Sequence, residues 1–294
     1  MASAAVKVLD EAHGASWSMY HGDCVDVLAQ LPENAVDLSI YSPPFLDLFV
    51  YSDSAADMGN SANAEEFGAH YKFMATELHR VTRPGRLCAV HCSEIPRKKM
   101  VEGVIGIHDF PGDLIRWHEE CGWIFHCRVT IWRDPVVEMQ RTKALGLLYK
   151  QLRKDSCRSR VGMGDYILVF RKDGDNDRPV EHKPADFPLD RWQKWASPVW
   201  DDIDQTKTLN VRIARGDKDE KHLCPLQLDV IERCLVMWSR EGDTVFSPFA
   251  GVGSEGVVSL QHRRKFLGVE LKGSYFASAV ANLEHEEGQG WLFD

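Results

Sequence analysis

Short apolar runs alternate with amphipathic stretches along this chain, and that alternation constrains the fold more than any other feature. Seven runs have the length and the β-branched or aromatic content of strands, and helix-like stretches separate several of them. We therefore predict an α/β protein with a seven-stranded, mostly parallel sheet and helices on both faces. The predicted strands are 17–20, 36–41, 87–91, 123–132, 166–170, 244–246 and 266–270. The predicted helices are 64–81, 113–121, 226–238, 253–261 and 274–284.

Composition places the chain among ordinary globular proteins. Of its 294 residues, 44% are hydrophobic and 27% are charged, and no repeat of fixed period interrupts the pattern. The N-terminus shows no basic segment followed by an apolar one, and no apolar run reaches about 18 residues, so we expect a cytoplasmic protein with no membrane segment.

The eight cysteines include no CxxC pair, which argues against a disulfide framework and a common zinc spacing. One group resembles a metal site, namely His118, Cys121, His126 and Cys127. Because the intervening residues indicate a strand whose side chains alternate between faces, we expect core packing and no metal there.

A net charge of −9 conceals a local basic segment. Between Met139 and Arg160 seven lysines and arginines stand against Asp155 alone. Such a segment could follow a phosphate backbone or be a solvated helix face, and charge alone leaves both open.

A glycine-rich turn follows the strand at 244–246. Gly251, Gly253 and Gly256 match the G-x-G-x-x-G pattern, and Glu270 ends the next strand 19 residues after Gly251. The bare pattern is typical of NAD enzymes. Its physical requirement is weaker, because a tight turn, a close backbone and an acid for the ribose hydroxyls suit any cofactor that contains adenosine. A turn that only joins strand to helix remains the other interpretation.

The strand at 36–41 ends in Ser42-Pro43-Pro44-Phe45. The two prolines remove two N–H donors and leave carbonyls at the carboxyl edge of the sheet, where ligands bind. An exocyclic amino group of a base is a poor nucleophile, because its lone pair is delocalised into the ring. Acceptors such as the Ser42 hydroxyl and the Pro43 carbonyl would free that lone pair by taking hydrogen bonds from the N–H groups, while Phe45 stacks on a flipped base.

Together the two motifs resemble the amino-methylating DNA methyltransferases, whose signature is [S/N/D]-P-P-[Y/F] with an F-x-G-x-G turn. In the permuted β group the tetrapeptide precedes the cofactor turn, as Ser42 to Phe45 precedes Phe249 to Gly253 here. The resemblance implies a Rossmann-like class I methyltransferase fold in permuted motif order. It also implies S-adenosyl-L-methionine as cofactor and double-stranded DNA as substrate, as in a bacterial or phage restriction-modification methylase. It favours a homodimer, since dimers are frequent in this group.

The same resemblance assigns the cofactor site. Gly22-Asp23-Cys24 is similar to the segment that contacts the cofactor adenine, although Asp23 could equally be a helix N-cap. Segment 221–227 is similar to the one that contacts the methionine end, and Glu270 would hold the ribose. The expected cofactor-binding residues are Asp23, Cys24, Pro225, Ser247, Phe249, Ala250, Gly251, Val252, Gly253, Ser254 and Glu270.

This sequence departs from the family at two positions. Many members have an acid where Ser247 stands, and many adenine-specific ones have Asp where Ser42 stands, so negative charge near the cofactor amino group is missing. Asp37, Glu255 or a carbonyl could replace it. In the family SPP tends to accompany cytosine-N4 methylation, which we favour over adenine-N6. Cytosine-C5 methylation is disfavoured, because it needs an attacking cysteine and the chain has no Pro-Cys pair.

We expect three regions. Residues 1–171 form the catalytic half with a basic DNA-facing segment at 133–164, residues 172–220 form an irregular insert for target recognition or capping, and residues 221–294 form the cofactor half. Aromatic residues of the insert should pack against the body; they are Phe187, Trp192, Trp195 and Trp200. The expected DNA contacts are Arg133, Arg141, Lys143, Lys150, Arg153, Lys154, Arg158 and Arg160.

Overall fold

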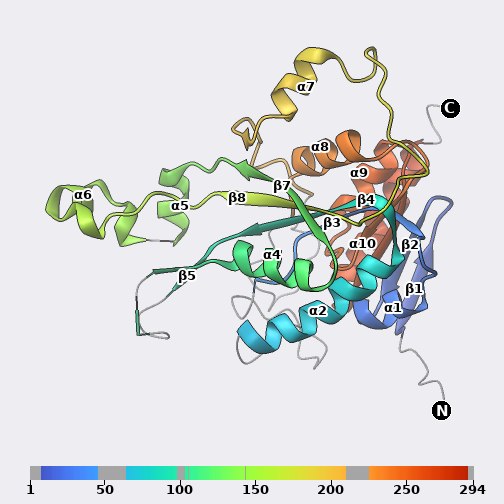
Figure 1. Cartoon of the computed structure of the whole chain (residues 1–294), viewed down its shortest axis with the longest axis horizontal. Coiled ribbons are helices and arrows are strands. Elements are labelled where there is room, and N and C mark those ends of the chain that lie inside the picture. The colour runs from blue at the N-terminus through green and yellow to red at the C-terminus, as the bar shows by residue number, and fades with distance from the viewer. Residues whose placement is uncertain are drawn as a thin grey trace.

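A single large sheet runs through the protein in the computed structural model (Figure 1), which describes residues 8–45, 64–97, 103–104, 106–142, 144–209 and 225–290. In these residues the sheet has nine strands in the order β1-β2-β11-β10-β3-β4-β8-β7-β9. Their bounds are β1 Asp10–His13, β2 Trp17–His21, β3 Val36–Tyr41, β4 Thr82–Ser93, β7 Ile124–Ile131, β8 Asp165–Arg171, β9 Val199–Trp200, β10 Thr244–Ser247 and β11 Lys265–Glu270. A separate two-stranded sheet pairs β5 Ile95–Arg97 with β6 Gly106–His108.

All seven predicted strands are present, and the prediction of seven is wrong only at the two edges. Strand β1 has the polar sequence DEAH and no apolar alternation, so it forms only because it pairs antiparallel with β2. Strand β9 is two residues long and pairs parallel with β7. The sheet is mixed, because β8 runs antiparallel to both of its neighbours, β4 and β7.

Helices cover both faces of the sheet. Helices α1 Cys24–Gln30, α2 Ala64–Val81 and α4 Phe110–Glu120 pack on one face. Helices α8 Leu228–Trp238, α9 Ser254–Gln261 and α10 Gly273–Gly290 pack on the other. Strand β3 serves both layers, since Leu38 and Ile40 face the second set and Tyr41 faces the first. In the described residues no helix combines the length and apolarity that a bilayer span requires.

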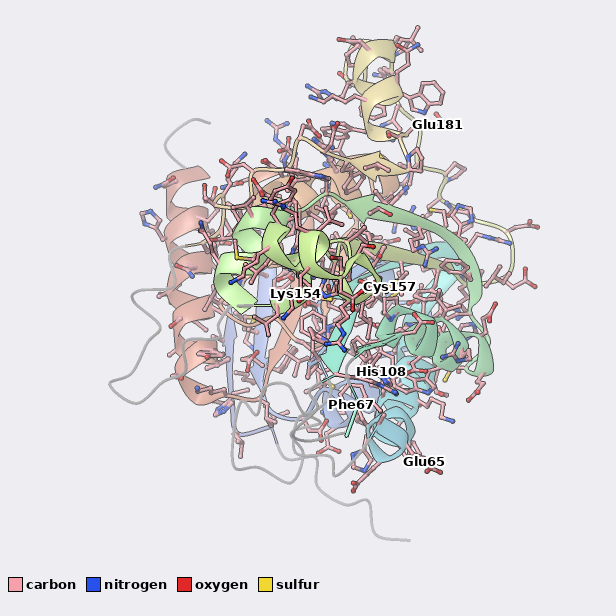
Figure 2. All side chains as sticks on the ribbon, turned by 90° about the vertical axis from the view of Figure 1, so that its left-hand side faces the viewer. Glu65, Phe67, His108, Lys154, Cys157 and Glu181 are labelled. Atoms are coloured by element: carbon pink, nitrogen blue, oxygen red, sulfur yellow. The ribbon has the colours of Figure 1, made fainter. Side chains whose placement is uncertain are left out.

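The basic segment forms an arm that extends beyond the ends of β7 and β8 (Figure 1). The arm, residues 133–164, contains α5 Pro135–Thr142, α6 Tyr149–Lys154 and two short 3-10 turns at Leu145–Leu147 and Ser156–Arg158. Figure 2 views it end-on, with Lys154 and Cys157 toward the viewer. Buried Glu138 ties the arm together, because it accepts hydrogen bonds from the Met163 amide at 2.7 Å and from Arg160 at 2.8 Å.

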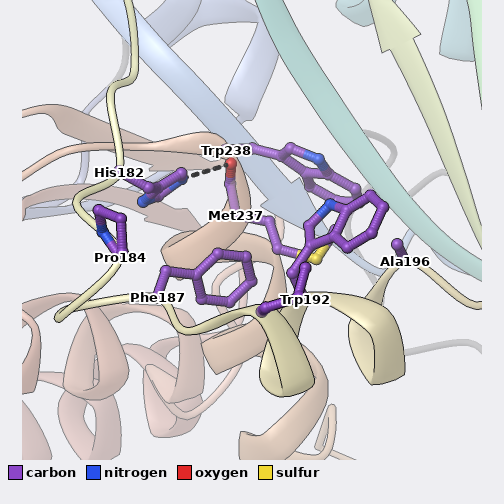
Figure 3. A pocket seen from close by; sticks show the side chains of 8 residues that line it. His182, Pro184, Phe187, Trp192, Ala196, Met237 and Trp238 are labelled. Atoms are coloured by element: carbon purple, nitrogen blue, oxygen red, sulfur yellow. Dashed lines mark hydrogen bonds between the residues drawn. The ribbon is translucent and has the colours of Figure 1, made fainter.

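The insert is more regular than the sequence predicts. It contains α7 Leu189–Trp195 as well as β9, while residues 210–220 lie outside the described part of the chain. Trp200 is buried in the core, and the Arg233 guanidinium lies 5.1 Å from its ring centroid. Trp192 and Phe187 line a cavity of about 450 Å³ between the insert and the end of α8 (Figure 3). The prediction that these aromatic residues anchor the insert is therefore confirmed for Trp200.

Strand connections place a topological switch point between β10 and β3. Strand β10 leads through α9 to β11 on one side, whereas β3 leads to β4 on the other. The two strands are themselves parallel neighbours. In open α/β sheets the chain leaves a crevice at such a point, beyond the carboxyl ends of the strands, and ligands bind there. Ser42 follows the carboxyl end of β3, and the glycine turn follows that of β10.

Candidate active site

The tetrapeptide Ser42 to Phe45 follows a strand that is buried along its whole length. Pro43 and Pro44 are buried, whereas Ser42 and Phe45 are partly exposed. The Phe45 ring meets that of Phe110 edge to face, with centroids 5.9 Å apart. The prolines thus fix the backbone in the core and leave the Ser42 hydroxyl and the Phe45 ring accessible at the crevice.

Ser42 contacts a polar pair that sequence reasoning missed. Its Oγ lies 3.1 Å from Nδ1 of His91, and His91 Nε2 lies 3.5 Å from a carboxylate oxygen of Asp165. Asp165 in turn pairs with Arg133. Burial alone would raise the pKa of Asp165, but the hydrogen bond and charge of His91, together with Arg133, lower it below its usual value. The sequence did offer one indication of His91, because this residue ends the predicted strand 87–91 and so lies at the carboxyl edge, where ligands bind.

The register of the sheet explains this meeting. Strand β3 pairs with β4 so that Tyr41 faces Val90, which brings the next residues, Ser42 and His91, side by side. Strand β4 pairs with β8 so that Ser93 faces Asp165. Ser42 and His91 thus lie at the carboxyl ends of two parallel strands, and Asp165 reaches the same edge from the amino end of the antiparallel β8.

The turn after β10 has the features of a close approach to a ligand. Gly251 has φ +54°, and a Cβ atom there would meet no protein atom within 4 Å. Its amide donates to the Glu270 carboxylate at 2.9 Å, and the Lys272 amide donates to the same carboxylate at 2.8 Å. Gly256 is glycine for another reason, since a Cβ would lie 2.6 Å from Phe266 and Leu283. The turn is thus open toward the crevice and tightly packed behind.

Two buried hydroxyls beside this turn indicate that it holds a polar ligand. Ser247 and Ser254 are buried, and their Oγ atoms have no hydrogen-bond partner among the described residues. An unsatisfied buried hydroxyl costs about 1–3 kcal/mol, so native proteins seldom leave one without a role. With the open face of Gly251 and the carboxylate of Glu270, these residues fit an adenosine cofactor.

Asp23 and Cys24 lie next to Glu270. The Gly22 amide donates to the Glu270 carbonyl at 3.1 Å, which joins the end of β2 to the end of β11. Asp23 accepts from the Val25 amide at 2.8 Å, so the structure confirms that it caps α1. Burial raises the pKa of Asp23 and raises that of the Cys24 thiol far more. The adenine contact of Asp23 stays a prediction.

Asp37 and Glu255 are the two acids that could replace the negative charge missing near the cofactor amino group, and they lie in different parts of the structure. Asp37 lies at the other end of the sheet, where it accepts from the Thr244 amide at 2.9 Å and pairs with Arg83 at 3.2 Å. Glu255, in contrast, lies buried in the first turn of α9, and burial with the Glu270 charge raises its pKa to about 8. Of the two side chains, only Glu255 is beside the glycine turn.

The segment expected at the methionine end is described only in part. Residues 221–224 lie outside the described residues. Pro225 precedes Leu226, which is buried in the same cluster as Ala250 of the turn. Phe249 packs on Tyr41 with ring centroids 5.8 Å apart, and Val252 packs on Tyr275. Gly253 has φ +86° and packs on Ala279.

The expected DNA contacts fall into two groups. Lys150, Arg153, Lys154 and Arg158 are exposed on the arm, with Arg158 paired to Asp155 at 3.2 Å. Arg133 and Arg160 instead form the ion pairs with Asp165 and Glu138 that hold the base of the arm. Arg141 lies in α5, and Lys143 is outside the described residues.

His118 is a core residue. Its ring stacks on Phe170 with centroids 3.9 Å apart, Nδ1 donates to the Leu114 carbonyl at 2.7 Å, and Nε2 lies 3.3 Å from the Tyr41 hydroxyl. Burial lowers the pKa of His118 to about 4, so the ring is neutral. Cys127, by contrast, is exposed. No set of three or more His, Cys, Asp or Glu side chains in the described ranges is arranged to hold a metal ion.

Comparison with known proteins identifies the family. The model of the DNA methylase family N6_N4_Mtase matches residues 36–281, a span that contains both the tetrapeptide and the glycine turn. The chain belongs to this DNA methylase family. It is an S-adenosyl-L-methionine-dependent DNA methyltransferase of the class that modifies exocyclic amino nitrogens. The NAD interpretation of the glycine pattern is therefore wrong for this chain, because the family uses S-adenosyl-L-methionine; that the glycine turn binds this cofactor stays a prediction.

Several relatives share most of the chain at low identity. The DNA adenine methyltransferase YhdJ of Escherichia coli K12 is 24% identical over 272 residues, which cover 91% of this chain and 82% of YhdJ. The chain spans 61%, 82% and 90% of the lengths of three curated relatives that it matches.

Solved structures share the fold. TTHA0409 of Thermus thermophilus in complex with S-adenosyl-L-methionine gives a TM-score of 0.68 at 21% identity, covering 91% of this chain and 93% of that one. PvuII DNA methyltransferase, described as cytosine-N4-specific, gives 0.65 at 17% identity, covering 93% and 91%.

Proposed function

We propose that this methylase transfers a methyl group to N4 of cytosine in double-stranded DNA, and that it belongs to the permuted β group. Ser42 carries the proposal, because in the family SPP tends to accompany cytosine-N4 methylation, whereas Asp or Asn stands at this position in many adenine-specific members. A structural neighbour of the same fold is named as cytosine-N4-specific. Adenine-N6 is the second candidate, since a relative that covers 91% of this chain is named as an adenine methyltransferase.

In this mechanism Ser42 and Pro43 act on the target amino group. The Ser42 hydroxyl oxygen and the Pro43 carbonyl accept hydrogen bonds from its two N–H groups, which localises the nitrogen lone pair. The Phe45 ring, braced edge-on by Phe110, stacks on the flipped base. S-adenosyl-L-methionine, when bound, supplies an electrophilic methyl group on a sulfonium centre.

The glycine turn and its neighbours hold the cofactor. The carboxylate of Glu270 accepts the ribose hydroxyls, and Asp23 and Cys24 lie against the adenine. The unpartnered hydroxyls of Ser247 and Ser254 meet polar groups of the cofactor. Glu255 is buried beside the turn and its pKa is raised to about 8, so near neutral pH it offers the cofactor a protonated carboxyl group and does not supply the negative charge that this chain lacks at positions 42 and 247.

The arm and the insert bind the DNA. Lys150, Arg153, Lys154 and Arg158 contact phosphates, which fixes the register of the enzyme on the duplex without reading its sequence. The insert 172–220 serves target recognition, and the halves 1–171 and 221–294 supply catalytic and cofactor groups to one sheet.

Nucleoside mass spectrometry tests the assignment of the base. The enzyme is incubated with labelled S-adenosyl-L-methionine and unmethylated duplex DNA, and the digested nucleosides are separated. We expect label in N4-methylcytosine. Label in N6-methyladenine would show that adenine is the target base and would leave the proposed amino methylation intact. Label in 5-methylcytosine would overturn both the base assignment and the proposed reaction.

A further inference from the structure

The Ser42 hydroxyl is the first member of a four-residue chain of polar contacts that ends in an ion pair. We propose that His91, held by Asp165 and Arg133, is a positioning residue that orients the Ser42 hydroxyl and takes its proton as the methylated nitrogen loses a proton to the Ser42 oxygen. The inference rests on the proposed methylation of an amino nitrogen.

Three neighbouring strands carry this chain of contacts, and its middle members are shielded from bulk water. Ser42 directly follows β3, His91 lies near the end of β4 and Asp165 begins β8. His91 is 7% exposed and Asp165 is 1% exposed, whereas the Arg133 side chain is 28% exposed. The chain of contacts thus leads from the crevice into the protein and back toward the surface at the base of the arm.

In this chain of contacts His91 has a weaker partner at Nε2 than Asp165 has in Arg133. His91 Nε2 lies 3.5 Å from Oδ2 of Asp165, at the outer limit of a hydrogen bond, whereas Arg133 pairs closely with the same oxygen. The other carboxylate oxygen of Asp165, Oδ1, is buried and has no hydrogen-bond partner among the described residues. A purely structural network is expected to satisfy its buried groups, because each unsatisfied one is destabilising. A loosely paired histidine beside a carboxylate is suited to exchange a proton.

The proton balance assigns each ring nitrogen a role. With the neutral ring protonated on Nε2 toward Asp165, Nδ1 accepts the hydrogen bond from the Ser42 O–H. The Ser42 lone pairs then face the amino group. The nitrogen lone pair forms the N–C bond, and the electrons of the broken C–S bond remain on sulfur. The cationic nitrogen loses a proton to the Ser42 oxygen as Ser42 passes its own proton to Nδ1, and the resulting imidazolium faces Asp165.

Other charged groups near His91 set the conditions for this transfer. Asp165 on β8 faces it directly, and Arg133 after β7 partly neutralises Asp165. Glu94, three residues after His91, accepts from the Tyr166 hydroxyl at 2.6 Å, and Arg128 lies 5.4 Å from the Tyr166 ring centroid. An imidazolium at His91 cannot accept the Ser42 proton, so the rate of methyl transfer should fall at acid pH.

The variant His91→Asn separates this role from a packing role. Asparagine keeps an acceptor near the Nδ1 position but cannot take a proton. We expect single-turnover methyl transfer to fall about 100-fold, within the usual range for a lost acid–base group, and its acid limb to disappear from the pH profile. Affinity for S-adenosyl-L-methionine should be unchanged. His79→Asn, on α2, is the matched control and should keep both rate and profile. A His91→Asn enzyme of normal rate, or a slow one that keeps the wild-type acid limb, would overturn the inference.

A second readout does not need methyl transfer. In ¹⁵N NMR of the imidazole rings, Ser42→Ala should shift the Nδ1 resonance of His91, because it removes the hydrogen bond at 3.1 Å. An unchanged resonance would refute the contact. If the wild-type enzyme methylates no base of any DNA while Ser42→Ala shifts the His91 resonance, the proposed function fails and the contact stands.

Discussion

Gly251 and Gly242 form a matched pair that tests the cofactor turn. Both have positive φ, +54° and +79°, and at both a Cβ atom would meet nothing within 4 Å. Gly251 follows β10 at the carboxyl edge of the sheet, whereas Gly242 precedes β10 at the opposite edge. Alanine in the left-handed region costs roughly 1–2 kcal/mol. Each alanine variant should therefore lose that much stability, which lowers Tm by about 2–4 °C per kcal/mol for a chain of this size.

Only Gly251→Ala should also lose the cofactor. The open space next to Gly251 is where a ligand approaches the backbone, so a methyl group there displaces it. A tenfold to hundredfold increase in Kd corresponds to about 1.4–2.8 kcal/mol, and we expect the effect to reach at least this range. Thermal unfolding without ligand measures the strain, and isothermal titration with S-adenosyl-L-methionine measures the affinity. If both variants unfold early and bind the cofactor like wild type, the space beside Gly251 is not the cofactor site.

Two further predictions concern the arm and the buried acid. Replacing Lys150, Arg153 and Lys154 with glutamine should make DNA binding less salt-dependent, by about 0.9 in the slope of log K against log salt for each lost phosphate contact, whereas Lys265→Gln at the start of β11 should not. An unchanged slope in the triple variant would place the DNA elsewhere. Because burial raises the pKa of Glu255 to about 8, the folded protein holds a proton that the unfolded chain has released above about 4.5. Stability without cofactor should thus fall by roughly 1.4 kcal/mol per pH unit between pH 6 and 7.5 in urea unfolding, and Glu255→Gln should lose that part of the pH dependence; equal slopes would argue against it.

The strands and helices of the core were predictable because burial leaves a periodic trace. Strand β3 is apolar enough to be recognised alone, and the α2 bounds agree with the predicted 64–81. The edge strands were not predictable, since β1 is polar and β9 is too short for any period. Their pairing depends on neighbours, and the sequence pattern does not specify which strands become neighbours.

The residues of the candidate site also differ in whether the sequence alone could predict them. Ser42 and Gly251 lie in local motifs, so the sequence indicated them directly. His91 and Asp165 are 49 and 123 residues from Ser42, and only the register of β3, β4 and β8 brings them together. For the same reason Arg133 was predicted to be a phosphate contact, whereas the structure places it in an ion pair with Asp165. The phosphate contact of Arg133 stays a prediction.

Methyl transfer by Ser42→Ala tests the central claim most directly. The control is Ser39→Ala in the middle of β3, where the residue is paired with β10 and β4 and lies away from the carboxyl edge that carries Ser42. Both variants are given labelled S-adenosyl-L-methionine and unmethylated duplex DNA, and the labelled nucleosides are quantified. We expect Ser39→Ala to produce N4-methylcytosine at the wild-type rate, and Ser42→Ala to bind the cofactor normally while transferring at least 100-fold more slowly. A Ser42→Ala enzyme as active as the control would contradict the account.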